Sequence, residues 1–148
     1  MNAHSHFIAA AALALPLAAA CGTGTALAND TSVIQDDPAE VKLAAKKTPF
    51  NKSVLSDGAA HSCVKVTVTN QRSSNLSVNP LYFSLTDTTN EKHESLDALG
   101  NYEDQIETTT LAPNEKVRGT VCAKGDFTPA KVAFTDELLQ EIARAQVK

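Results

Sequence analysis

Aromatic residues are scarce in this sequence, which contains no Trp, two Tyr and five Phe among 148 residues. A core must therefore be built mainly from Val, Leu, Ile and Ala. Lys, Arg, Asp and Glu are absent from the first 20 residues. The chain carries a formal net charge of −4, which argues against binding to nucleic acid through phosphate neutralisation. Its length and its 43% of hydrophobic residues suit one globular domain.

Signatures of known catalytic sites are also missing. No G-x-S-x-G, H-E-x-x-H or phosphate-cradling Gly loop occurs. His61, before an expected strand, and His93, in an expected exposed turn, are more typical of solvated residues than of general bases. Glu103, Asp104 and Glu107 lack the spacing of a known calcium loop, so we interpret them as a solvated acidic face. We therefore expect no enzyme, no cofactor and no metal site.

An apolar run stands at the N-terminus and extends from Phe7 to Ala20. It is shorter than the ~20 apolar residues of a membrane-spanning helix and fits the apolar region of a signal peptide. Three alanines followed by Cys21 resemble a bacterial lipobox. That resemblance implies that the Cys21 sulfur is diacylglycerylated and that Cys21 becomes the new N-terminus. We therefore predict a signal peptide over residues 1–20 and a lipid anchor on Cys21, which holds the protein at the extracytoplasmic face of the cell membrane.

A second cleavage site competes with the one before Cys21. The triplet Ala26-Leu27-Ala28 matches the A-x-A rule of ordinary signal peptidase. Cleavage there would release a freely secreted protein that starts at Asn29. Both forms of export stay open at this point.

An acidic stretch follows the apolar run. Residues 21–40 contain four acids and no base, are rich in Gly, Thr, Ala and Asp, and show no apolar periodicity. We interpret them as a flexible acidic tether, or else as a disordered terminus without a role. Residues 41–148 contain 13 acids and 13 bases and therefore form a neutral body with mixed surface charge.

Short alternating segments separated by turn signals begin at residue 41. In residues 63–70, Val64, Val66 and Val68 alternate with polar residues, which is the pattern of a half-buried strand. Further strands are expected over residues 41–48, 75–80, 81–87, 92–96, 108–123 and 131–136, with turns at Asp57-Gly58, Thr88–Asn90 and Ala112–Glu115. Roughly seven strands at ~8–12-residue spacing, without long helices between them, predict an all-β sandwich or barrel.

The last 14 residues show a different pattern. Leu138, Leu139 and Ile142 would lie on one helical face, and Thr135 or Asp136 could cap its N-terminus. We therefore predict a short C-terminal helix.

Two cysteines remain in the body of the chain, Cys63 and Cys122. Each is one residue out of phase with an apolar residue of its strand, Val64 or Val121, so both thiols are expected on the same side. An even number of cysteines in an exported chain favours a structural disulfide, which would close a loop of about 60 residues. A metal site or reactive thiol is the alternative, but His61 near Cys63 lacks the usual ligand spacing.

Three segments in the order CVKVTVTNQRSSNLSV, LYFSLTD and LAPNEKVRGTVCA are similar to a family of immunoglobulin-like domains of unknown function. The family occurs in Gram-positive, especially actinobacterial, lipoproteins and in a secreted mycobacterial immunoprotective antigen. The positions that carry the resemblance are Val64, Val66, Val68, Asn70, Phe83, Leu85, Asp87, Leu111, Pro113, Glu115, Gly119, Val121 and Cys122. They lie within residues 41–135, and the resemblance implies an immunoglobulin-like antiparallel β-sandwich without established catalysis.

These features together predict a cell-surface lipoprotein with a non-catalytic immunoglobulin-like binding or envelope domain over residues 41–148. Its partners are expected to be the membrane, through Cys21, and an unknown protein or envelope ligand, but not nucleic acid. Two alternatives remain: a freely secreted antigen-like protein, and a metal-binding or enzymatic protein whose site carries no recognisable motif.

Overall fold

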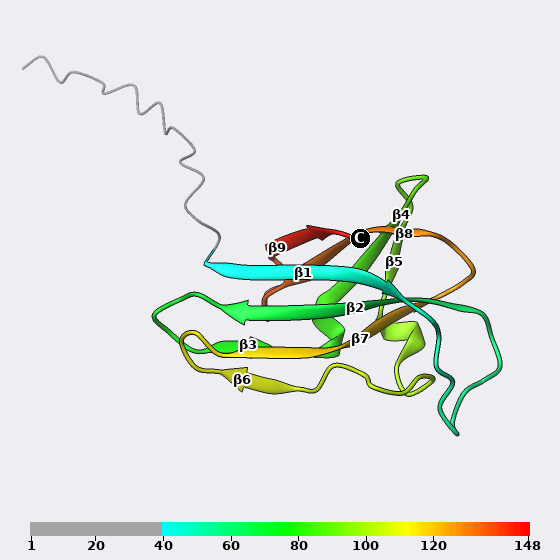
Figure 1. Cartoon of the computed structure of the whole chain (residues 1–148), viewed down its shortest axis with the longest axis horizontal. Coiled ribbons are helices and arrows are strands. Elements are labelled where there is room, and N and C mark those ends of the chain that lie inside the picture. Colours follow the sequence, from blue (N-terminus) through cyan, green and yellow to red (C-terminus); the bar gives the residue numbers. More distant parts are fainter. Residues whose placement is uncertain (1–39) are drawn as a thin grey trace, which may run out of the picture. The chain divides into compact units, whose positions relative to one another are not determined.

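The computed structural model describes residues 40–148, which include the whole of the predicted body (Figure 1). The predicted signal peptide over residues 1–20, the predicted anchor Cys21 and all but the last residue of the predicted tether lie outside the described residues. Within residues 40–148, no helix has the length and apolar character that crossing a bilayer requires.

Nine strands with short connections follow one another along the described chain. They are β1 (Val41–Thr48), β2 (His61–Asn70), β3 (Leu76–Val78), β4 (Phe83–Asp87), β5 (Lys92–Glu94), β6 (Thr109–Leu111), β7 (Lys116–Lys124), β8 (Pro129–Thr135) and β9 (Glu141–Gln146). Two 3-10 helices, η1 (Pro80–Tyr82) and η2 (Leu96–Ala98), flank the β4–β5 hairpin. The predicted all-β class is therefore confirmed, with nine strands in place of about seven.

Two antiparallel sheets face each other across one apolar core (Figure 1). The first sheet has the order β1-β2-β7 and the second the order β5-β4-β8-β9, while β3 pairs with β6. Most core side chains are Val, Leu, Ile and Ala, as the scarcity of aromatics requires. The exceptions include Phe83 and Phe134, which are stacked with 4.8 Å between ring centroids. The predicted immunoglobulin-like β-sandwich is the observed architecture.

The alternation in β2 determines which side of the first sheet faces the core. Val64, Val66 and Val68 are fully buried, and Lys65 and Thr67 between them point to the outer side. A slip of one residue would exchange the two sets and expose the valines. Because both neighbouring strands pair with β2 in continuous register, the residues that share its outer face are also determined.

Short contacts cover both edges of the first sheet. At β1, the Lys47 N–H donates to the Lys148 carbonyl at 2.9 Å, which places the end of the chain that follows β9 beside β1. At β7, the Ile106 N–H donates to the Thr120 carbonyl at 3.0 Å, and the Thr120 N–H donates to the Asp104 carbonyl at 2.7 Å. Neither edge therefore presents a long row of unpaired backbone groups.

Asn70 ties the end of β2 to the loops around it. Its side chain is fully buried and donates from Nδ2 to the carbonyls of Ser74, at 2.8 Å, and Leu111, at 3.0 Å. Its Oδ1 accepts the Arg72 N–H at 3.0 Å, and its carbonyl accepts the Asn114 N–H at 2.7 Å. Only a side chain with both donors and an acceptor can satisfy these groups, which explains the Asn that ends this strand motif.

The prediction of a C-terminal helix is wrong. Leu138 and Leu139 are exposed in a tight turn between β8 and β9, and Leu139 has φ +61°. Asp136, expected as a helix cap, instead accepts the N–H groups of Leu138 and Gln140, both at 2.9 Å, and so closes a hairpin. A helix of this length is marginal by itself, whereas β9 supplies partners for the open edge of β8.

Candidate functional site

The outer side of the first sheet carries an array of cations. We use the name basic face for the outward-pointing cations of β1, β2 and β7. These are Lys42, Lys46, Lys65, Lys116 and Arg118. They occupy three successive rows across the sheet, and β2 contributes Thr69, Thr67 and Lys65 to these rows in turn. None of them forms an ion pair with a carboxylate of residues 40–148. Five cations thus gather on the outer side of one sheet, and Asp104 and Glu107 share a pocket with Lys65 and Arg118 at its β7 edge.

A groove of about 520 Å³ crosses the basic face. Its lining includes Lys46, Lys65 and Arg118, together with Lys148. Arg118 Nε donates to Thr67 Oγ1 at 3.2 Å, which holds the guanidinium against β2. The groove is therefore lined by three small residues, Ala44, Ala45 and Thr67, and by four cationic residues.

Lys46 and Lys65 stand directly opposite each other in the β1–β2 ladder. Like charges at such a pair destabilise a sheet by about 0.2–1 kcal/mol, and no carboxylate of residues 40–148 pairs with either of them. A surface that serves only solubility intersperses charges of both signs. Concentrated positive charge of this kind is typical of a surface that attracts an anionic ligand.

The other end of the same outer face holds a disulfide. Cys63 and Cys122 are partners in the β2–β7 register, with an S–S distance of 2.02 Å and 4.1 Å between their Cα atoms. Phe50, Ala98 and Tyr102 cover the bridge. Burial raises the pKa of Tyr102 to about 12, so its phenol is neutral. The bridge therefore joins two neighbouring strands of one sheet, on the side away from the main core.

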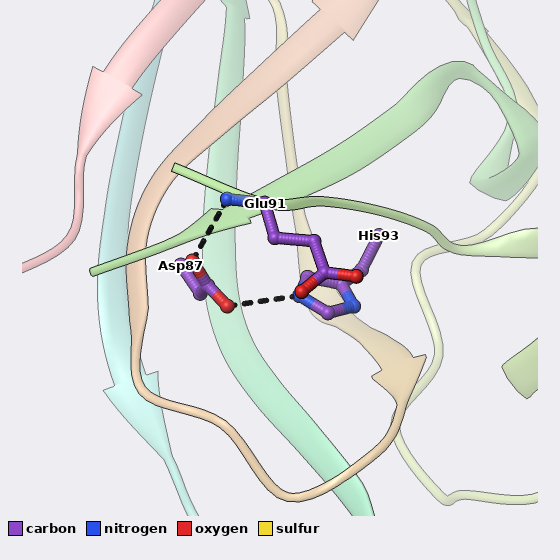
Figure 2. A group of neighbouring side chains, drawn as sticks. All are labelled: Asp87, Glu91 and His93. Carbon is purple, nitrogen blue, oxygen red and sulfur yellow. Dashed lines mark hydrogen bonds and ion pairs between the residues drawn. The ribbon is translucent and has the colours of Figure 1, made fainter. Parts of the chain in front are cut away.

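A second group of polar side chains lies at the β4–β5 hairpin (Figure 2). Asp87 ends β4, Glu91 follows the turn and His93 lies in β5. His93 Nε2 is 3.2 Å from Asp87 Oδ2, and the His93 ring stacks on Phe127 with 3.8 Å between centroids and 7° between planes. The expectation of an exposed, solvated His93 is therefore wrong, because the ring is sandwiched against Phe127 and paired with a carboxylate.

The Asp87 carboxylate divides its two oxygens between the turn and His93. Its Oδ1 accepts the N–H and the hydroxyl of Thr89, both at 2.7 Å, and the Glu91 N–H at 2.9 Å. The hydroxyl of Thr89, the ring of His93 and the two backbone N–H groups hold the pKa of Asp87 well below its usual range, although burial opposes them. The site therefore keeps a fixed negative charge, with Oδ2 directed at the imidazole.

The other residues considered in the sequence do not form sites of their own. His61 is buried, stacks on Phe50 at 4.8 Å between centroids and has Nδ1 2.9 Å from the Ala59 carbonyl, so the expectation of a solvated surface histidine is wrong. Among the described residues, the acidic cluster predicted at 103–107 does not converge on a common point. The only group of metal-ligating side chains close together there is the one at the β4–β5 hairpin.

Pairing across the hairpin turn is the signal that the sequence analysis missed. The turn at Thr88–Asn90 was predicted correctly, and the structure places it between Asp87 and Glu91. Folding the chain back at that turn brings Asp87 to the same end of the hairpin as Glu91 and His93. Spacing alone, without the turn, does not distinguish these three residues from the other acids and histidines of the chain.

Comparison with known proteins agrees with this fold. The chain matches the model of a family described as "Domain of unknown function (DUF4352)" over residues 26–124. No curated protein matches the sequence. The secreted protein MPT63 of Mycobacterium tuberculosis is similar in structure, with a TM-score of 0.50 and 16% identity over 72% of this chain and 84% of MPT63. At that identity the likeness concerns the fold.

A second solved structure is that of ycdA, a candidate lipoprotein of Bacillus subtilis. It aligns with a TM-score of 0.47 and 18% identity, over 67% of this chain but only 32% of the ycdA chain. The family model spans more than half of this sequence and reaches from before β1 to the end of β7. The protein therefore belongs to the DUF4352 family of domains of unknown function.

Proposed function

We propose that this protein is a non-catalytic binding module outside the cytosol, held at the membrane by a lipid on Cys21, and that its basic face binds an anionic polymer of the cell envelope. The single observation that carries the binding function is the basic face, with five cations on one sheet surface and no ion-pairing acid among the described residues. Support for export comes from the Cys63–Cys122 bond, since disulfides persist in oxidising compartments. The similar protein MPT63 is a secreted protein.

The dimensions of the basic face favour a polymer over a single small anion. Lys42 and Lys46 are four residues apart on β1, which corresponds to about 13 Å along the strand. Lys42 and Lys116 lie on either side of β2, which corresponds to about 10 Å across the sheet. One phosphate or carboxylate cannot contact all of these cations, whereas anionic groups repeated along a chain can. The open groove between them leaves room for the backbone of such a chain.

Neutralising the facing lysines tests this proposal. The double variant Lys46→Gln/Lys65→Gln should bind long-chain inorganic polyphosphate at least about tenfold more weakly than the wild type, because each cation near an anionic surface contributes about 1 kcal/mol. The slope of log affinity against log salt concentration should also decrease, because fewer counterions are released. Isothermal titration calorimetry at several salt concentrations measures both effects. The variant should be at least as stable as the wild type, because a like-charge pair has been removed.

The matched control is Lys131→Gln, which removes a lysine from the outer side of β8 in the other sheet. It should leave polyphosphate binding unchanged. Two results would contradict the proposal: wild-type protein that does not bind polyphosphate at low salt, or a double variant that binds as tightly as the wild type. Competition by inorganic phosphate at equal phosphate concentration would show a single-anion site and would also reject the polymer.

The mass of the exported protein and its retention at the membrane test whether Cys21 carries a lipid anchor. We expect the intact mass of the exported protein to show a diacylglyceryl group on Cys21. Cys21→Ala should abolish membrane retention, whereas Ala28→Leu, which blocks the A-x-A site, should leave it unchanged. A soluble wild-type product that starts at Asn29 would exclude the anchor and support free secretion.

A further inference from the structure

We propose that Asp87, Glu91 and His93 form a binding site for a divalent transition-metal cation with the ligand preference of Zn²⁺ (Figure 2). The site belongs to the sheet that does not carry the basic face, so it does not depend on polymer binding. Imidazole nitrogen and carboxylate oxygen are ligands of Zn²⁺ and its first-row neighbours. Ca²⁺ instead takes about six to eight oxygens, which this group cannot supply.

The distances between the ligand atoms suit a tetrahedral ion. Bonds of about 2.0–2.1 Å at a tetrahedral angle place two ligand atoms about 3.3 Å apart. Asp87 Oδ2 and His93 Nε2 are 3.2 Å apart, so both can bind one ion with little movement. All three side chains have a ligand atom within 4.8 Å of the others. Glu91 is exposed, so rotation of its side chain can bring its carboxylate to the same ion.

The β4–β5 turn holds the Asp87 carboxylate in place for this role. Three hydrogen bonds from Thr89 and Glu91 fix Oδ1, and Oδ2 takes no part in the turn. One of these bonds comes from the backbone N–H of Glu91, so the same turn that orients Asp87 also positions Glu91. Fixing ligands in this way by hydrogen bonds to neighbouring groups is a general feature of metal sites.

The His93 ring is held by packing. It stacks almost parallel on Phe127, which follows β7. In this position Nε2 points toward Asp87 (Figure 2). A neutral imidazole can offer the Nε2 lone pair to a metal ion. Rotation of the ring away from the site would break the stack on Phe127, so the ligand atom is positioned before an ion binds.

The charge of the site favours a cation. Asp87 and Glu91 place two carboxylates around one imidazole, and within residues 40–148 no Lys or Arg pairs with either of them. Lys92, between them and His93 in sequence, instead pairs with Glu94 at 2.8 Å. A divalent ion would neutralise the two carboxylates, with the fourth position left for water.

Calorimetric titration of the chelator-treated full-length exported protein with ZnCl₂ tests the site. We expect one Zn²⁺ per chain and a rise in melting temperature of at least about 5 °C at saturation, because the ion binds the folded hairpin. His93→Gln should abolish binding. Glu91→Gln, which keeps the backbone N–H used by the turn, should raise the Kd at least about tenfold while the protein without metal keeps its melting temperature.

Two further measurements distinguish this site from metal binding elsewhere. Glu94→Gln changes an exposed carboxylate of the same hairpin and should bind Zn²⁺ like the wild type. In NMR spectra, the His93 ring protons should be shifted by the Phe127 ring and should move further on addition of Zn²⁺. Absence of Zn²⁺ binding, or binding that survives both His93→Gln and Glu91→Gln, would overturn the proposal, as would His93 signals that do not respond to bound Zn²⁺.

Discussion

Replacing Cys63 and Cys122 together by Ala should lower the free energy of unfolding by about 4 kcal/mol. The bond links residues 59 positions apart, and closing a loop of that size restricts the unfolded chain by about this amount in the chain-entropy model. Net stabilities of domains are only about 5–15 kcal/mol, so the loss is a large part of the total. Urea unfolding of the exported protein measures it, and the melting temperature should fall by roughly 15 °C or more.

Reductant provides the control for the disulfide. Wild-type protein treated with a thiol reductant should become about as unstable as the Cys63→Ala/Cys122→Ala variant, and the variant itself should not respond to reductant. The bridge lies beneath Phe50, Ala98 and Tyr102, so reduction should require partial unfolding and be slow. A double variant as stable as oxidised wild type would show that the bond does not support the fold.

The relative orientation of the two cysteines could be predicted from sequence because strand alternation is a local property. Cys63 precedes Val64 and Cys122 follows Val121, and each valine faces the core. Each cysteine must therefore point outward. The same local rule located β1, β2, β4 and β8 within a few residues, since each alternates apolar and polar side chains or lies between clear turn signals.

The prediction of a C-terminal helix failed because the local pattern does not show that this segment pairs with β8. Leu138 and Leu139 suit a helical face, but the open edge of β8 offers backbone partners that a short helix cannot match. Asp136 can begin a helix or close a turn with the same acceptor oxygen. Whether Asp136 begins a helix or closes a turn depends on the pairing with β8, which the local sequence does not reveal.

Both candidate sites depend on pairings between separate segments. Alternation shows that Lys65 points outward, but only the registers of β1 and β7 place Lys46 and Arg118 beside it. Similarly, the spacing of Asp87 and His93 becomes informative only once the turn between β4 and β5 has brought them together. Sequence reasoning therefore found the strands, whereas the sites on their surfaces require the register.

Gly119, inside the sandwich, also depends on a contact with a segment that is distant in the sequence. The sequence places it among the apolar residues of its strand, and nothing nearby in the chain explains why a side chain is missing. The structure does: the segment that contains Ile106 crosses beside β7 and donates its N–H to the Thr120 carbonyl. A Cβ on Gly119 would lie 2.7 Å from the Ile106 backbone nitrogen and would also collide with the Ile106 Cα. Backbone atoms cannot rotate away as a side chain can.

Gly119→Ala should therefore destabilise the protein by about 3 kcal/mol or more, at the upper end of the range for overpacked cores, because a backbone segment must move. The melting temperature should fall by roughly 12 °C or more. In hydrogen exchange, the amides of Ile106 and Thr120 should lose more protection than the other amides of β7. The control Lys116→Ala, on an exposed position of the same strand, should change stability by only about 0.5 kcal/mol. If Gly119→Ala were as stable as the wild type, the segment around Ile106 could not lie against β7.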